Sequence, residues 1–454
     1  MTLHAHSGRF HCAKVLKLPT NYCDWVKMKI RSKSLVFAMS ISLLVPTSLM
    51  TTSAVAATKT TLTIDSWRTD DSKIWKEVII PIYEKANPGV KVVWAPSPSN
   101  EYDSALSLRM KSKTAADIIM CRPYGLTKAL IKDKHLTNLT GLPGLTNFTT
   151  QSMQSWADAK GVPFCVPSAS VGAGFYYNKN IFKELKLTVP KTQAEFIAVL
   201  EAIKKNGKYT PLAATGTSAD SWMLDQMGLQ LVGPYYWKGD AGGVALDNGT
   251  RKVTDPEYVA AFEALASWKP YLPKAFSSVS YSDAEQLFIL GRAAIAAEGS
   301  WSVKEMAPPG SNVGVFGAPV AKAGDKPYVQ VLADHGFGIN AASPNQAAAK
   351  KLLTWFTTKE FAQVYANSLP GFFPLSKDKI SIDNKTAQAW LDLRDGAIVN
   401  APIGMDKMNT GTPNWFSVTT NLLNVMMTTK MTGKQAAAEL QKSLESWYPP
   451  QKKK

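Results

Sequence analysis

Charged side chains stand next to aromatic rings at several points of this sequence, and these residues have the greatest capacity for chemistry. The runs are Trp67-Arg68-Thr69-Asp70, Arg122-Pro123-Tyr124 and Glu298-Gly299-Ser300-Trp301, and Asp334-His335 pairs a carboxylate with an imidazole. Indole and phenol rings offer flat apolar faces, while carboxylates and guanidinium groups make paired hydrogen bonds. Together these groups suit a ligand that has both apolar faces and polar edges.

Groups arranged for catalysis are scarce. Beyond residue 56 the only histidines are His135 and His335, which excludes a histidine-rich metal site. The sequence has no H-E-x-x-H, no G-x-S-x-G and no P-loop motif. We therefore expect no metal, no cofactor and no enzymatic activity. Carboxylates are numerous, so an exported glycosidase, with two carboxylates facing one bond, is kept as an alternative.

The chain is basic, but its charge is scattered. The formal net charge is +16, and an excess of basic residues before Ala57 accounts for part of it. Apart from Lys452, Lys453 and Lys454, the basic residues of the remainder form no run or stripe, so we expect no nucleic-acid partner. The length of 454 residues, 45% of them hydrophobic, indicates about two or three globular domains.

The first part of the chain has the pattern of a signal peptide. A basic segment contains Lys27, Lys29, Arg31 and Lys33, an apolar segment spans residues 35–45, and Ala54-Val55-Ala56 is a small-residue cleavage site. We expect a mature, soluble, periplasmic protein that begins at Ala57. Residues 1–27 precede the complete signal peptide, so Met28 is an alternative start to Met1. Since no repeat or anchor is visible, an adhesin is disfavoured.

Two α/β bodies are predicted from the spacing of apolar residues. Strands are expected at residues 61–67, 90–94 and 118–121. The helix after the first strand is predicted to be capped by Ser72 and kinked at Pro81, and the next helix to begin near Tyr102. This order predicts a doubly wound lobe with parallel strands, whose carboxyl ends line a ligand crevice. Trp67 and Arg122 follow two of these ends.

The second body repeats the pattern after residue 178, where Asn178 is expected to cap a helix. Capping boxes are predicted at Thr192/Glu195, Ser282/Glu285 and Thr357/Glu360, and an N-cap at Ser343. Strands are expected at residues 211–215, 293–297 and 313–316. Helices are expected near 258–268, 384–397, 415–430 and 433–447.

Two stretches rich in small residues are predicted to cross between the bodies. Residues 161–182 contain Ser168 to Gly174, and residues 328–340 contain Gly336 and Gly338. Small residues let backbones approach closely and bend. An ordinary buried strand is the alternative for the first stretch. Cys121 and Cys165 are expected to be separate buried thiols, although an oxidising compartment would permit a disulfide.

Four motifs, in order, resemble the extracellular solute-binding protein family 1, the sugar receptors of ABC importers, and especially its maltose-binding type. They are Ala116-Asp117-Ile118-Ile119, Tyr177-Asn178-Lys179, Phe288 to Trp301 with Gly291-Arg292-Ala293-Ala294, and Gly338 to Asn345. The resemblance implies a periplasmic-binding-protein-like class II fold, with two doubly wound α/β lobes joined by a multi-strand hinge. The chain would be a monomer that captures a carbohydrate and delivers it to membrane permease subunits.

The resemblance also implies a division of the chain. Residues 1–56 would be an extension and signal peptide, 57–169 with 336–378 an N-terminal lobe, and 170–335 with 379–454 a C-terminal lobe. Crossings are expected near Ser168 to Val171, near Asp334 to Phe337, and after Pro374.

Ligand contacts follow from the same resemblance, with Trp301 as the stacking aromatic. The expected ligand-binding residues are Trp67, Arg68, Asp70, Arg122, Tyr124, Trp222, Glu298, Trp301, Asp334, His335, Phe373 and Trp415. A core role is the alternative for Trp301 and Trp67, and a surface ion pair for Arg68 with Asp70. Cys121 and Pro123 depart from the maltose-type pattern and argue against maltose itself. A glycerol phosphate-type ester or a polyamine is the alternative ligand.

Overall fold

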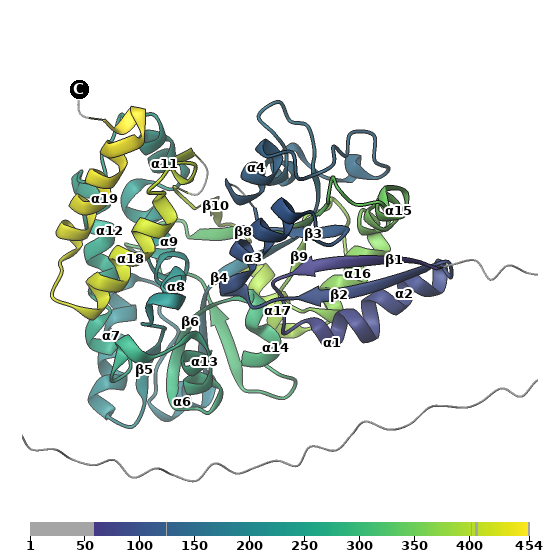
Figure 1. Cartoon of the computed structure of the whole chain (residues 1–454). Coiled ribbons are helices and arrows are strands. Elements are labelled where there is room, and N and C mark those ends of the chain that lie inside the picture. The colour runs from purple at the N-terminus through teal and green to yellow at the C-terminus, as the bar shows by residue number, and fades with distance from the viewer. Residues whose placement is uncertain (1–58, 124, 401, 405–406, 453–454) are drawn as a thin grey trace, which may run out of the picture. The chain divides into compact units, whose positions relative to one another are not determined.

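The computed structural model describes residues 59–123, 125–400, 402–404 and 407–452, which belong to one compact unit (Figure 1). The predicted signal peptide, its cleavage site at Ala56 and the predicted site residue Tyr124 lie outside the described residues.

A single sheet path runs through the molecule in the order β2-β1-β3-β8-β4-β6-β5. The strands are β1 (Thr60–Ser66), β2 (Val90–Pro96), β3 (Ile118–Cys121), β4 (Cys165–Asn178), β5 (Thr210–Ala213), β6 (Ala293–Gly299), β7 (Val313–Phe316), β8 (Tyr328–Ile339), β9 (Phe373–Pro374) and β10 (Ile398–Asn400). β1 pairs in parallel with β2 and β3, and β5 pairs in parallel with β6. β4 and β8 run antiparallel to their neighbours on this path. The parallel strands predicted for the first body are therefore confirmed.

Helices cover the sheet on both sides of the β4–β8 pair (Figure 1). In the first body these are α1 (Ser72–Ile74), α2 (Ile80–Ala86), α3 (Ser99–Ser112), α4 (Gly125–Lys132), α5 (Thr150–Met153), α15 (Gln346–Phe356) and α16 (Lys359–Ser368). In the second they are α6 (Lys179–Glu184), α7 (Gln193–Asn206), α8 (Trp222–Leu224), α9 (Gln230–Val232), α10 (Pro234–Trp237), α11 (Asp240–Asp247), α12 (Pro256–Ala266), α13 (Tyr281–Ile289), α14 (Val303–Met306), α17 (Lys385–Asp392), α18 (Trp415–Thr428) and α19 (Gly433–Trp447). Two π-helical turns, η1 (Trp75–Ile79) and η5 (Asp225–Leu229), join α1 to α2 and α8 to α9.

Two of the predicted helix starts are confirmed by their hydrogen bonds. The Asn178 side chain accepts from the backbone N–H groups of Asn180 and Ile181. Thr192 and Glu195 form the predicted capping box at the start of α7. Each cap supplies partners to backbone N–H groups that have none within the helix.

Four other predicted caps are wrong, because the N-cap position falls on a neighbouring residue. The box at α13 is formed by Ser280 and Asp283, two residues before the predicted pair Ser282 and Glu285. Asp71, not Ser72, is the N-cap of α1, and Thr358, not Thr357, caps α16. Thr357 donates to Thr354 O instead.

The fourth wrong cap is at α15, where Asn345 occupies the N-cap position. The predicted cap, Ser343, accepts from Asn345 N and donates to Asp117 at 2.5 Å. The sequence pattern fits several neighbouring positions, and contacts with distant residues decide among them.

The strands β4 and β8 pair along much of their length and connect two hydrophobic cores. Cys165 to Gly172 lie opposite Val331 to Gly338, with irregular register on both sides of Ala169. One core takes its buried residues from 62–171 and 332–372. The other takes them from 173–318 and 403–448. The chain thus leaves one core at Val171 and enters the other at Ala173, within a single strand.

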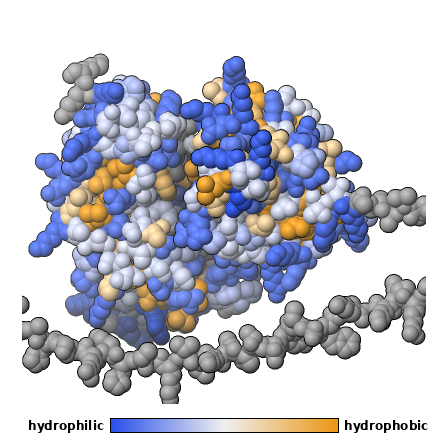
Figure 2. All heavy atoms as spheres, viewed as in Figure 1, coloured by the Kyte–Doolittle hydropathy of each residue, from blue (hydrophilic) through white to orange (hydrophobic). Residues whose placement is uncertain are grey.

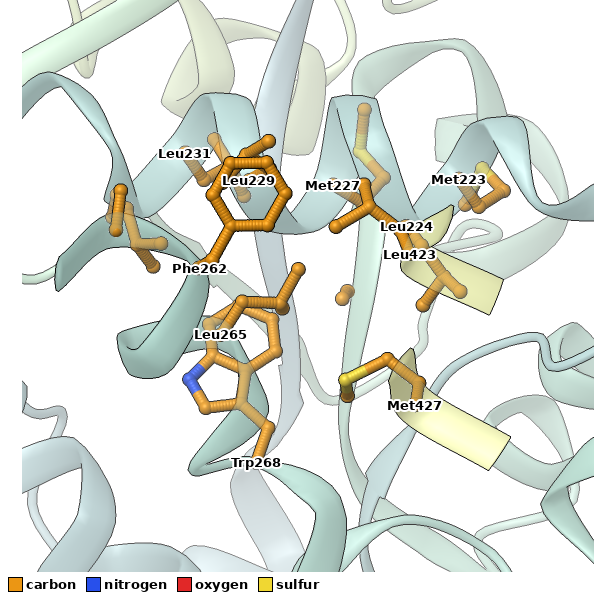
Figure 3. Packing of buried hydrophobic residues seen from close by; sticks show 14 of the residues in the cluster. Met223, Leu224, Met227, Leu229, Leu231, Phe262, Leu265, Trp268, Leu423 and Met427 are labelled. Atoms are coloured by element: carbon orange, nitrogen blue, oxygen red, sulfur yellow. The ribbon is translucent and has the colours of Figure 1, made fainter. Parts of the chain in front are cut away.

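The second core is formed mainly by helices. Side chains of α8, η5, α12 and α18 converge in Figure 3, where Leu265 and Trp268 face Met227 and Met427. On the opposite side of β6 a smaller cluster contains Tyr176, Phe288 and Trp390. The outer face shown in Figure 2 is mostly polar, with apolar side chains in small separate patches.

Cys121 and Cys165 are free and buried, as expected from the sequence. Their strands, β3 and β4, flank β8 on opposite sides. A methyl group at Gly338 would lie 3.1 Å from one sulfur and 3.0 Å from the other. Burial and then the neighbouring Cys121 raise the pKa of the Cys165 thiol well above its usual value.

Candidate functional site

Two rings and a guanidinium form the first part of the site, at the carboxyl ends of β1 and β3. Trp67, directly after β1, meets the Tyr102 ring edge to face at 5.4 Å. The Arg122 guanidinium lies 4.4 Å over the Trp67 ring. Arg122 is also paired with Asp103 at 3.0 Å and donates to Ser99. Two of the predicted ligand-binding residues are therefore stacked on one another at neighbouring strand ends.

Arg68 pairs with Asp71 and not with Asp70, the partner considered from the sequence. Its Nε and Nη2 atoms lie 2.6 and 3.1 Å from the two Asp71 oxygens, and its guanidinium lies 4.7 Å over the Phe372 ring. Burial alone would lower the pKa of the Arg68 guanidinium, but the attraction of the Asp71 carboxylate is larger, so this pKa is raised. Asp70 is exposed next to this fixed pair.

Asp334 and His335 of β8 form a relay with Tyr365 of α16. The His335 Nδ1 atom lies 2.6 Å from Asp334 Oδ2, and its Nε2 atom lies 2.9 Å from the Tyr365 hydroxyl. Every group is satisfied when Tyr365 donates to Nε2 and Nδ1–H donates to Asp334. Burial favours neutral Asp334, but His335, Arg68 and Arg122 outweigh it and lower the pKa of this carboxyl. Asp334 is thus an oriented, ionised acceptor whose side chain is 21% exposed.

A second group of aromatic residues belongs to the other body. Trp301 lies in a short 3-10 turn (Ser300–Ser302) after β6 and packs against both hydrophobic cores. Its ring centroid is 6.0 Å from that of Trp222, the first residue of α8. Its Nε1 atom donates to the Tyr281 hydroxyl at 3.0 Å. Trp301 and Trp222 are both half-buried. The fold thus brings together two predicted ligand-binding residues that belong to separate elements.

Three glutamates surround this aromatic group. Burial raises the pKa of Glu298, Glu285 and Glu305, and repulsion between neighbouring carboxylates adds to the effect on each. Glu285 and Glu298 line a cavity of about 10 Å³, enough for about one water molecule. The carboxylates of this site therefore take up protons at a higher pH than exposed glutamates do.

Charged residues after β1 act on carboxylates of the second body. Arg68 of the first body acts on the Glu305 carboxylate of α14, and Asp70 acts on Glu285 of α13. The charged residues of the loop after β1 are therefore close enough to α13 and α14 to affect the pKa values of carboxylates on these helices.

Other predicted site residues lie deeper in the structure. Trp415 is 1% exposed in the second core, and its Nε1 atom is buried without a hydrogen-bond partner. Phe373 is 2% exposed and packs under the Arg394 guanidinium, 4.9 Å from its ring centroid. Glu298 is 3% exposed and accepts from the backbone of Gly299. His335 is fully buried and reaches the site through Asp334.

Tyr281, Glu285 and Tyr365 are parts of the site that sequence reasoning missed. The capping box predicted at Ser282 assigns Glu285 a helix-capping role, whereas its carboxylate accepts from Ser302 Oγ. Tyr365 follows Phe361 at helical spacing, a pattern that indicates a core residue, and its side chain is indeed buried.

Within the described ranges, no three His, Cys, Asp or Glu side chains come together as a metal ion would require. None of the helices described is both long and apolar enough to cross a membrane.

Comparison with known proteins gives matches along most of the chain. The model of the family described as bacterial extracellular solute-binding protein matches residues 65–363. A multiple sugar-binding protein of Streptococcus mutans serotype c is 26% identical over 303 residues, 63% of this chain and 69% of that protein. A maltotriose-binding protein of Pyrococcus abyssi is 28% identical over 209 residues, 44% of this chain and 41% of that protein.

Solved structures show the same fold at lower identity. A chitin oligosaccharide binding protein has a TM-score of 0.73 at 21% identity, over 86% of this chain and 98% of its own. The solute-binding protein RafE in complex with raffinose has a TM-score of 0.71 at 21% identity, over 87% of this chain and 100% of its own. The periplasmic-binding-protein-like α/β fold predicted from the sequence is confirmed by these likenesses.

Proposed function

Because this chain belongs to the bacterial extracellular solute-binding proteins, we propose that it is a receptor that captures an oligosaccharide and delivers it to the permease of an ABC importer. The observation that carries the proposal is Trp301, which packs against both cores and lies next to Trp222. The names of the sugar-binding relatives support a carbohydrate as the ligand.

The chemistry of the site suits a sugar ring. A sugar has flat C–H faces that an indole can cover, and hydroxyl groups around its edge that donate to carboxylates. Trp301 and Trp222 supply the faces, and Asp334 supplies an ionised acceptor that Tyr365 and His335 orient. The guanidinium plane of Arg68 is fixed by its pairing with Asp71, and that of Arg122 by its stacking on Trp67. Their remaining N–H groups can therefore donate to hydroxyl oxygens of the ligand.

We also propose that the chain divides into the two lobes predicted from the sequence. The N-terminal lobe would comprise residues 57–169 with 336–378, and the C-terminal lobe 170–335 with 379–454. The passage of β4 from one core to the other between Val171 and Ala173 supports this division. The receptor would act as a monomer, exported to the periplasm after cleavage near Ala56.

Binding without chemistry is part of the proposal. Glu285 and Glu298 have raised pKa values, a property of general acids, so hydrolysis is the activity to exclude. Maltotriose or raffinose incubated with the protein should be recovered intact by chromatography. Shortened products would show that the protein is an enzyme.

Thermal unfolding with a panel of solutes tests the proposed function. A ligand that binds only the folded state raises the melting temperature, by a free energy of about 2.7 kcal/mol at 100 times Kd. We expect a rise with one class of oligosaccharide. A rise only with a polyamine, a phosphate ester or an iron chelate would overturn the carbohydrate proposal.

A further inference from the structure

We propose that Tyr281 is a positioning residue that fixes the plane of the Trp301 indole through a one-directional chain of hydrogen bonds ending at Glu285. This role deepens the proposed function and rests on it, since Trp301 is the proposed stacking surface for the ligand. Tyr281, Ser302 and Glu285 have no role among the predicted ligand contacts.

The chain of hydrogen bonds has four members. Trp301 Nε1 lies 3.0 Å from the Tyr281 hydroxyl, which lies 3.0 Å from Ser302 Oγ. Ser302 Oγ lies 3.0 Å from Glu285 Oε1 and donates to it. An indole N–H can only donate, so the Tyr281 hydroxyl accepts from Trp301. Because Ser302 donates to Glu285, the Tyr281 proton is directed to Ser302 Oγ or to the Glu285 and Glu298 carboxylates that it also faces. All donors therefore point away from Trp301 and toward these carboxylates.

The Tyr281 backbone is also held in place. Tyr281 is the first residue of α13 and lies between Ser280 and Asp283, which form the capping box. Its N–H donates to Asp220 at 2.9 Å, and Asp220 lies two residues before Trp222. The Tyr281 ring lies 5.9 Å from the Trp222 ring. One tyrosine therefore contacts both aromatic residues proposed to stack on the ligand.

Fixing the indole matters because an aromatic residue that can rotate must be ordered when the ligand binds. Ordering a side chain lowers affinity, and a side chain held in its bound orientation avoids this loss. Burial and the charges of Glu298 and Glu285 raise the pKa of Tyr281, so its hydroxyl keeps its proton.

The direction of the chain depends on the charge of Glu285. Carboxyl groups face Glu285 from three other elements: Glu298 in β6, Glu305 in α14 and Asp70 in the loop after β1. Arg68 acts on Glu305 and lies beyond it. Tyr281 and Ser302 are the hydrogen-bonding neighbours of Glu285, and burial raises its pKa. Protonation gives Glu285 a donor in place of an acceptor lone pair and loosens the chain in acid.

The first test uses the protein without ligand. In ¹⁵N-labelled protein, the Trp301 indole N–H resonance is assigned with Trp301→Phe and followed from pH 7.5 to pH 4. We expect it to move with a midpoint above the ordinary glutamate value of about 4.3. The movement should disappear in Glu285→Gln, and in Tyr281→Phe the resonance should shift to that of an unbonded indole. An unchanged resonance in Tyr281→Phe would overturn the proposal.

The second test measures affinity, with maltotriose and raffinose as first probes and then the sugar that most raises the melting temperature. Loss of one hydrogen bond should weaken binding about three- to tenfold in Tyr281→Phe. Tyr258→Phe is the matched control, because Tyr258 also donates one buried hydrogen bond, to Gly242 at 2.8 Å, away from the site. Equal affinities in the two variants would overturn the positioning role.

The two tests separate failure of this inference from failure of the proposed function. If the wild-type protein binds no sugar, the carbohydrate proposal fails, and the role of Tyr281 in the ligand's site fails with it. If the wild type binds sugar but the Trp301 resonance does not respond to Tyr281→Phe, only the positioning role is wrong.

Discussion

At the scale of single residues, the site relies on side chains whose orientation is fixed by others. Asp334 is oriented through His335 by Tyr365, and Trp301 is held by Tyr281. The two sets of hydrogen bonds come from different bodies. They orient Asp334, proposed to accept from the hydroxyl edge of the sugar, and Trp301, proposed to cover its C–H face.

Trp301→Ala should weaken sugar binding far more than it destabilises the fold. Removing a central aromatic contact commonly costs about 2–4 kcal/mol, which corresponds to a fall in affinity of roughly 30-fold or more. Trp75→Ala is the contrast, because Trp75 is 1% exposed and stacks on Trp94 at 4.2 Å. That variant should lose about 3–5 kcal/mol of unfolding free energy. Ligand titration and urea unfolding of both variants check this; collapse of Trp301→Ala with normal binding by the folded remainder would make Trp301 a core residue.

Asp334→Asn should lower stability at pH 7 and less so in acid. The folded pKa of Asp334 is lowered, so its ionised form stabilises the fold above the ordinary aspartate pKa, and this contribution is lost as pH falls through the folded pKa. A hydrogen bond to a charged group contributes about 1.5–3 kcal/mol. Urea unfolding of both proteins at pH 7 and pH 3 measures the difference. A difference that is equal at the two pH values would contradict the ionised relay.

At the scale of elements, each body contains a helix interrupted by a π turn. In η1 the π turn lies just before Pro81, whose missing N–H interrupts the regular hydrogen bonding of the helix. In η5 the turn begins with Asp225, which is fully buried. Its Oδ1 atom accepts from Gln230, while its Oδ2 atom has no partner.

Asp225→Asn should stabilise the protein at neutral pH. Burial raises the pKa of Asp225 to about 7, so the folded state retains a proton that the unfolded chain releases above about 3.9. Stability therefore falls as pH rises from about 4 to 7, and an amide avoids this loss. We expect a gain of about 2–4 kcal/mol at pH 7.5 that vanishes at pH 4. Urea unfolding measures it, and destabilisation at pH 7.5 would show that the carboxyl has an unseen partner.

Much of the fold could be predicted from local sequence, whereas the hydrogen bonds that orient Asp334 and Trp301 could not. Strands such as β3 are short apolar runs, and the cap at Asn178 is a local feature, so both were predictable. Ser280 and Ser282 each begin a serine-x-x-acid pattern, and only the folded backbone distinguishes them. Tyr281 and Trp301 are 20 positions apart, and their hydrogen bond depends on how α13 packs against β6. Spacing along the chain contains no record of that contact.

At the scale of the whole molecule, two cores share one sheet. β4 and β8 are the main strands common to both, and β9 adds a third segment at Ala169 and Ser170. Few backbone connections therefore join the two cores, and the hinge closure that we predict would need only small changes in these strands.

Ligand binding should make the protein more compact. Small-angle scattering with a saturating sugar should give a smaller radius of gyration than the ligand-free protein. Trp301→Ala at the same sugar concentration is the control, since it should remain largely unliganded. An identical radius for free and saturated wild-type protein would indicate a rigid site.

The position of β8 between Cys121 and Cys165 has a consequence for folding in an oxidising compartment. The two cysteines are 44 positions apart, and the strand that separates them, β8, follows more than 160 positions later. While the nascent chain is being exported, the thiols can therefore meet before their spacer arrives. A disulfide formed at that stage would leave β8 without its place in the sheet. Once β8 is inserted, the backbones of β3 and β4 are two strand spacings apart, about 9.5 Å. This exceeds the Cα separation of about 7 Å beyond which a disulfide requires the backbone to move.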